Sequence, residues 1–248
     1  NRIGSGQLQD HLWVETRGYD ELSRLAARQV LGEAGVFRLA QGEYAQALDA
    51  LLNGGFWVDA AYVAERVLTL DELKKYVDGY WPPVAPEQVA KENETYGESQ
   101  ISPVRLRTQI RYLLARRLMR SFRGDEAREY YPAEWLPQYL ALVQALRTGW
   151  EESLPADQRA KALFEAAVIT RTNGMELIGT EVEPDWHVHA GNFDVGVTVS
   201  SRPTNENANA LIASEDELDR AKRHKADPEL RWHYRAQAAA LAWEAAKL

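Results

Sequence analysis

Residues 34–68 of the chain are AGVFRLAQGEYAQALDALLNGGFWVDAAYVAERVL, and this stretch decides the expected fold. Apolar residues recur at three- and four-residue steps on either side of Gly42 and of the turn Asn53-Gly54-Gly55. Such spacing places apolar side chains on one face of an α-helix, and Gly or Asn accepts the left-handed conformation that ends helices. The stretch therefore predicts three helices joined by two glycine turns.

Helical periodicity continues on both sides of this stretch. A longer helix is expected from Tyr19, and its Gly32 and Gly35 each lower helix propensity by about 1 kcal/mol relative to Ala. We expect these glycines to let a neighbouring helix approach closely. Downstream, Thr69 and Glu72 have the spacing of a capping box, which predicts the start of a further helix.

The chain is expected to divide into two helical parts. Residues 1–80 form the N-terminal helical repeats. Residues 81–102 form a linker or long loop, because they contain three Pro and many polar residues without an apolar period. Residues 103–248 form the C-terminal helical repeats, and Pro103 is a favourable first helical residue. One continuous solenoid is also compatible with this pattern.

The first helix of the C-terminal part has a stripe that we expect to be buried: Leu106, Ile110, Leu113, Leu114, Leu118 and Phe122. Further helices are expected over residues 132–148 and from residue 155 to about 173. An extended or short-strand insertion is expected near 176–212, where valines alternate with small or polar residues. Helices resume at Ser214, which has Glu217 at the capping-box position.

Six residues around the first glycine turn match tetratricopeptide repeat (TPR) positions in register: Ala34, Phe37, Gly42, Tyr44, Ala47 and Leu51. The stretch resembles that family, although Gly54 stands where the family usually has Ala. A similar signature starts at Gly55, 13 residues after Gly42, which is shorter than a full repeat. The resemblance implies an all-α fold, an irregular TPR-like α-solenoid of antiparallel helix pairs. It also implies a protein or peptide partner on a concave surface.

Residues 60–77 and 174–186 also resemble large uncharacterised bacterial solenoid proteins. This resemblance implies a bacterial origin and a helical fold, and it implies no activity. We expect both ends to be truncated, because Asn1 has no Met or signal-like region before it and Leu248 stops within a helical pattern. The compartment stays open, with a bacterial periplasm, cell envelope or secreted location favoured by the absence of Cys.

Composition and motifs exclude several kinds of site. The chain has no Cys, so disulfides, thiolate metal sites and a Cys nucleophile are excluded. A formal net charge of −8 argues against a nucleic-acid partner, which requires a basic surface. No apolar run reaches the roughly 20 residues of a transmembrane segment. P-loop, nucleophile-elbow and zinc-protease motifs are absent, and no cofactor is expected.

Aromatic and arginine side chains are the candidate binding residues. The expected concave surface includes Trp57, Tyr62, Tyr112, Trp135, Arg116 and Arg120. The two arginines belong to an Arg-rich segment, residues 105–123, for which two interpretations are open. It binds phosphate or an acidic peptide, or it is a solvated face paired with the acidic residues Asp125, Glu126 and Glu129. The solvated face is favoured because the chain as a whole is acidic.

His187 and His189 are the candidate metal ligands. On a strand both imidazoles would face one side, and Glu183, Asp185 or Asp194 would complete a zinc or iron site. A loop whose rings pack or face solvent explains the same pattern.

Three functions stay open. The expected function is a TPR-like scaffold that binds a protein or peptide partner, without assigned enzymatic activity. The first alternative is an envelope protein that binds glycans or small molecules on exposed rings. The second is a metal-dependent enzyme that uses His187 and His189.

Overall fold

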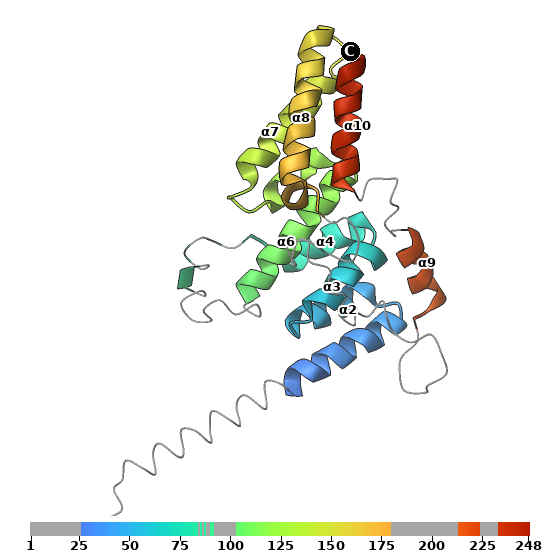
Figure 1. The fold of residues 1–248 in the computed structure, drawn as a ribbon. Helices are drawn as coiled ribbons and strands as arrows, with labels where there is room; N and C mark the ends of the chain where they lie inside the picture. Colours follow the sequence, from blue (N-terminus) through green and yellow to red (C-terminus); the bar gives the residue numbers. More distant parts are fainter. Residues whose placement is uncertain are drawn as a thin grey trace, which may run out of the picture.

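The computed structural model describes residues 26–83, 85, 87, 90, 91, 103–179, 213–223 and 233–248. Every regular element in these ranges is a helix, which confirms the predicted all-α class. None of the helices in the same ranges is long and apolar enough to cross a membrane. One group of helices comes from the first part of the chain, and a second group, α7, α8 and α10, lies at the opposite end of α6 (Figure 1).

The N-terminal group consists of short helices joined by tight turns. A helix over residues 26–40 precedes α2 (Tyr44–Asn53), α3 (Trp57–Tyr62) and α4 (Leu70–Tyr80). Both predicted glycine turns are present, with Gly42 at φ 78° and Gly55 at φ 76°, where a Cβ would be strained. Gly35 packs against α2, because a Cβ there would lie 2.7 Å from Leu51 Cγ. The close approach predicted at this glycine is confirmed.

Helix α4 begins where the sequence predicts. Thr69 Oγ1 accepts a hydrogen bond from the Glu72 N–H at 3.3 Å, and the Glu72 carboxylate accepts one from the Thr69 N–H at 2.8 Å. This reciprocal pair is the predicted capping box. Between α3 and α4 lies an element that the sequence did not predict, the π-helix η1 (Val63–Val67). It places Glu65 and Arg66 in the interior, where both are buried.

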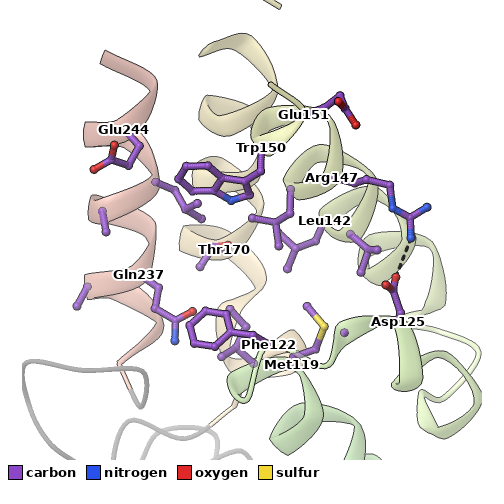
Figure 2. A pocket seen from close by; sticks show the side chains of 17 residues that line it. Met119, Phe122, Asp125, Leu142, Arg147, Trp150, Glu151, Thr170, Gln237 and Glu244 are labelled. Carbon is purple, nitrogen blue, oxygen red and sulfur yellow. Dashed lines mark hydrogen bonds and ion pairs between the residues drawn. The ribbon is translucent and has the colours of Figure 1, made fainter. Parts of the chain in front are cut away.

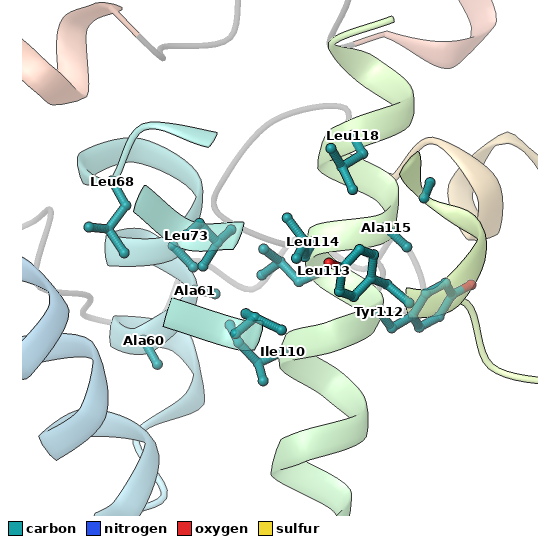
Figure 3. Close-up of a cluster of buried hydrophobic side chains, with 14 of the residues drawn as sticks. Ala60, Ala61, Leu68, Leu73, Ile110, Tyr112, Leu113, Leu114, Ala115 and Leu118 are labelled. Atoms are coloured by element: carbon teal, nitrogen blue, oxygen red, sulfur yellow. The ribbon is translucent and has the colours of Figure 1, made fainter. Parts of the chain in front are cut away.

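Helix α6 (Pro103–Arg120) connects the two groups and starts at the predicted proline. Five residues of its predicted stripe are buried: Leu106, Ile110, Leu113, Leu114 and Leu118. In Figure 3 this side of α6 faces the N-terminal group, where Leu73 of α4 and Ala60 and Ala61 of α3 are also buried. The prediction is wrong for Phe122, which is 86% exposed, because α6 ends at Arg120 and Phe122 lies in the following turn.

The C-terminal group consists of α7 (Leu136–Trp150), α8 (Ala156–Leu177) and α10 (Tyr234–Lys247). The short 3₁₀ helices η2 (Gly124–Glu126) and η3 (Arg128–Tyr130) lead into it from α6. Helix α8 packs against both α7 and α10 (Figure 1). Glycines permit both contacts, since a Cβ would lie 2.6 Å from Leu163 Cγ at Gly149 and 2.5 Å from Tyr234 Cγ at Gly174.

Helix α8 ends later than predicted. Asn173 has non-helical angles (φ −121°, ψ 19°), but the helix resumes beyond it and continues to Leu177. The predicted stop is wrong because Gly174 packs against Tyr234 of α10 and does not end the helix. Residues 176 and 177 of the expected insertion are therefore helical. The rest of that insertion, from residue 180, lies outside the described residues.

Helix α9 (Glu215–Arg223) lies beside η1 and not with the C-terminal group (Figure 1). Ser214 Oγ accepts a hydrogen bond from the Glu217 N–H at 3.1 Å, which confirms the predicted cap. The Glu217 side chain is buried against the N-terminal group.

Candidate functional site

The aromatic residues expected on a concave surface lie in or against the core. Tyr62 and Tyr112 are buried, at 4% and 6% exposure, and Trp57 and Trp135 are half-buried. Tyr112 Oη donates a hydrogen bond to the carbonyl oxygen of Glu176 at 2.6 Å, which joins α6 to α8. These rings therefore hold helices together and leave little surface for a partner.

Most of the arginine face of α6 is buried, which corrects the interpretation of a solvated face. Four of its arginines lie in the interior: Arg111, Arg116, Arg117 and Arg120. Arg123, beyond the helix end, does pair with Glu126 as expected and also with Asp71 at 2.6 Å. Arg111, Arg117 and Arg120 donate to backbone carbonyls, and Arg120 also donates to a glutamate. Neither kind of acceptor is visible as a local sequence pattern.

Glu65 and Arg120 form a buried ion pair within this cluster. Both side chains are 1% exposed, and Arg120 Nη2 donates to both carboxylate oxygens of Glu65. Arg120 Nη1 also donates to the carbonyl oxygen of Ile178 at 2.6 Å. The pair therefore connects η1 to α6 and to the end of α8. Its role is structural, because it presents no charge at the surface.

Arg117 satisfies the C-terminal end of the π-helix. Its guanidinium donates to the carbonyl oxygens of Ala64 and, at 2.7 Å, of Leu68. The backbone becomes extended at Leu68 (ψ 139°), so the last carbonyls of η1 lack helical partners further along the chain. The buried arginine therefore supplies the hydrogen-bond donors that the carbonyls at the end of the π-helix lack, and these carbonyls are the acceptors that its buried guanidinium requires.

A second polar network joins α4 to η3. Tyr130 Oη donates to Asp78 at 2.6 Å, and Lys74 Nζ contacts the same carboxylate at 3.0 Å. Burial, followed by the hydrogen bond to Asp78, raises the pKa of Tyr130 to about 12. Burial acts to raise the pKa of Asp78, but the hydrogen bonds from Tyr130 and Lys74 outweigh it and lower that pKa. These shifts move both groups away from neutral pH, which suits a structural contact better than acid–base catalysis.

His187 and His189 lie outside the described residues. Within the part of the chain that the structure describes, no three His, Asp or Glu side chains are grouped so as to hold a metal ion. The metal site stays a prediction.

The candidate binding site is a groove between α7 and α10, with α8 behind it (Figure 2). Its volume is about 940 Å³, comparable to the larger ligand pockets of proteins. Met119 and Phe122, from the end of α6 and the turn beyond it, lie at one end of the groove (Figure 2).

Apolar side chains dominate the groove. Those of α7 and α10 include Leu142, Val143, Leu146, Trp150, Ala236, Ala240 and Leu241. Trp150, the last residue of α7, is 51% exposed and its ring reaches toward α10 (Figure 2). An exposed indole in an apolar groove supplies a large contact area at a small conformational cost.

The backbone of Phe122 adopts an energetically unfavourable conformation. Its φ is 59°, in the left-handed region that bulky residues rarely adopt. The Arg123 N–H donates to the Leu118 carbonyl at 2.9 Å, a helix-ending motif in which glycine usually occupies the position of Phe122. Such a conformation costs about 1–3 kcal/mol and is concentrated at functional sites. Because the ring is also exposed, its burial does not offset this cost.

The charged residues of the groove are mostly acidic. Asp125, Glu151 and Glu244 line it together with one basic residue, Arg147. Arg147 pairs with Asp125 at 2.7 Å (dashed line in Figure 2), and Glu244 pairs with Lys247 of its own helix at 2.6 Å, which leaves Glu151 as the remaining carboxylate of the lining. The groove therefore favours a ligand with an apolar surface and positive flanks.

Thr170 of α8 places a polar atom just beneath the wall of the groove. Its side chain is 1% exposed, and Oγ1 has no hydrogen-bond partner among the described residues. A buried hydroxyl without a partner carries a desolvation cost that a ligand acceptor would relieve.

Sequence reasoning missed this groove. It assigned Phe122 to the core and gave Trp150 and Thr170 no role. The groove requires α10 to lie beside α8, a contact between distant segments for which no local pattern exists. In comparisons with known proteins, no protein-family model matches the chain, and no curated protein or solved structure matches it.

Proposed function

We propose that the chain is a protein-interaction scaffold that binds an apolar helical segment of a partner protein in the groove between α7 and α10. The observation that carries this proposal is the open apolar groove of about 940 Å³ with the half-exposed Trp150 beside it. A groove between two helices suits an amphipathic helix, whose apolar residues lie on one stripe and enter the groove together.

The groove also indicates the charge of the partner. Glu151 and Glu244 line it in addition to the Arg147–Asp125 pair, and Glu244 also contacts Lys247 at 2.6 Å at the exposed side of α10. A helix with Lys or Arg beside its apolar stripe would complement these carboxylates. The partner segment is therefore a basic amphipathic helix.

The helix pairs of the N-terminal group support an irregular TPR-like solenoid as the scaffold. The 26–40 helix with α2, and the α3–η1 segment with α4, are successive helical pairs joined by short turns. Gly42 adopts the turn conformation expected from the resemblance, and Ala47 is fully buried beneath it. The groove lies in the other group, so the predicted concave surface is proposed there and not around Tyr62 and Tyr112.

Peptide binding by two matched tryptophan variants tests this function. The probe is a labelled helical peptide of Leu and Lys residues with Leu at positions i, i+3, i+4 and i+7. Trp150→Glu alters the groove, whereas Trp243→Glu alters an exposed ring of α10 that does not line it. Trp243 is 65% exposed, so both replacements are compatible with folding.

We expect saturable binding to the native chain and a loss of about 10- to 100-fold in affinity for Trp150→Glu, the range for truncating an aromatic anchor. Trp243→Glu should bind as the native chain does. Equal weakening in both variants, or no saturable binding to the native chain, contradicts the proposal. A Lys peptide of equal charge without Leu separates groove binding from attraction to the acidic surface.

Thr170 favours a second candidate function, the binding of an apolar small molecule with one hydrogen-bond acceptor. The neutral dye Nile red, whose carbonyl accepts a hydrogen bond, is a suitable probe. Thr170→Val keeps the shape of the side chain and removes the donor, so it should weaken dye binding about 5- to 10-fold. Unchanged dye affinity in Thr170→Val removes the basis of this candidate and leaves the peptide proposal intact.

A further inference from the structure

Two tyrosines of the N-terminal group contact adjacent carboxylates of α9. Tyr44 Oη donates a hydrogen bond to Asp216 at 2.6 Å, and Tyr62 Oη donates one to Glu217 at 3.2 Å. Tyr44 belongs to α2 and Tyr62 to α3, so the two donors come from separate helices and meet consecutive residues of α9. The two tyrosine hydroxyls are therefore placed to bind the two carboxylates of an Asp-Glu pair on a helix.

Arg220, one turn further along α9, completes the contact. Its guanidinium pairs with Glu72 of α4 at 2.9 Å and lies over the Tyr44 ring, 4.7 Å from the ring centroid. It also pairs with Asp216 of its own helix at 2.9 Å. The underlying surface therefore recognises an acidic pair followed, four residues after the Asp, by an arginine.

Helix α9 itself buries little apolar surface in this contact. Glu217 is its buried residue, Ala221 is partly buried against the core, and Leu218 is 40% exposed. A nine-residue helix is marginal in isolation, and exposed ion pairs such as Arg220–Glu72 contribute little. Burying the Glu217 carboxylate also carries a desolvation cost that its contacts must offset. Hydrogen bonds and ion pairs therefore hold α9 in place. Another helix that offers the same polar groups can replace α9 in these contacts.

We propose that the surface formed by Tyr44, Tyr62 and Glu72 is a second docking site, specific for an acidic helix of another protein. Helix α9 occupies this site within the chain and is displaced by that helix. The matching chemistry is an Asp-Glu pair with an arginine four residues after the Asp, as in α9 itself. The site shares no residue with the α7–α10 groove, so it stands independently of the function proposed there.

The probe is a labelled peptide of residues 213–223, ASEDELDRAKR. The acceptor is the full chain with Asp216→Lys and Glu217→Lys, in which α9 no longer supplies carboxylates to the two tyrosines. We expect the peptide to bind this acceptor saturably. A peptide with the same two replacements should bind at least about ten-fold more weakly, because it lacks both charged hydrogen-bond acceptors. Equal affinity of the two peptides, or no binding, overturns the proposal.

A second measurement uses the native recognition residues and does not depend on the folding of the lysine variant. The native chain has no Cys, so Lys222→Cys and Lys75→Cys accept a pair of spin labels on α9 and α4. Excess unlabelled peptide should shift the measured distances from one short population to a broad, longer one. Retention of the short population at saturating peptide overturns displacement. Tyr44→Phe with Tyr62→Phe in the lysine acceptor removes the two donors and should also weaken peptide binding by about ten-fold or more. Unchanged binding there contradicts the assigned surface.

Discussion

Glu65 of η1 and Arg120 of α6 are 55 residues apart in the sequence and form an ion pair that is closed to solvent on both sides. Arg120 also donates to the carbonyl of Ile178, so one guanidinium connects the N-terminal helices to the end of α8. The relative placement of the two helical groups therefore depends on this contact.

Removing one partner of this pair should lower the free energy of unfolding much more than removing both. Glu65→Leu leaves the buried arginine without its carboxylate and should lower the free energy of unfolding by about 3–5 kcal/mol. Glu65→Leu with Arg120→Met removes both charges, and we expect it to recover much of that loss. Urea unfolding of the two single variants and the double variant measures the coupling. Additive single effects would contradict a direct pair.

Local sequence patterns predicted caps and turns well, but they contain no information about contacts between distant segments. The Thr69–Glu72 capping box and the turn at Gly42 depend on neighbours within a few residues, and both are present. The buried arginines and the groove depend on which helices meet. A guanidinium that donates to a carbonyl 49 residues away, as Arg117 does to Leu68, has no signature in its own helix.

Two glycine replacements should change stability in opposite directions. Gly174→Ala places a methyl group against the Tyr234 ring and should cost about 1–3 kcal/mol by separating α10 from α8. Gly79→Ala is the matched control, because nothing lies within 4 Å of a Cβ there and α4 is helical. It should stabilise the chain by up to about 1 kcal/mol. Thermal unfolding distinguishes the two, and a stabilising Gly174→Ala would contradict the close α8–α10 contact.

Phe122→Gly should raise the stability of the chain and weaken its binding of the peptide. Glycine accepts the φ of 59° without strain, so the free energy of unfolding should rise by about 1 kcal/mol or more. The same change removes a ring from the end of the groove, so the Leu–Lys peptide should bind more weakly. A variant that is more stable and binds equally well would show that the ring has no role in the groove.

Alkaline pH should weaken the Tyr130–Asp78 contact. The pKa of Tyr130 is raised from 10.0 to about 12 in the folded chain, first by burial and then by its hydrogen bond to Asp78. The folded state thus holds this proton more tightly than the unfolded state. The resulting stability is fully present below pH 10.0 and is lost as the pH rises toward about 12. Tyr130→Phe should lose less stability than the native chain over this interval, and an identical loss would contradict the assignment.

Amide hydrogen exchange of the full chain, with and without the Leu–Lys peptide, tests the central claim most directly. Binding in the groove should slow exchange in α7, α10 and the turn at Phe122, while α2 and α4 keep their rates. Protection confined to the N-terminal helices, or spread evenly over the acidic surface, would contradict the groove as the binding site.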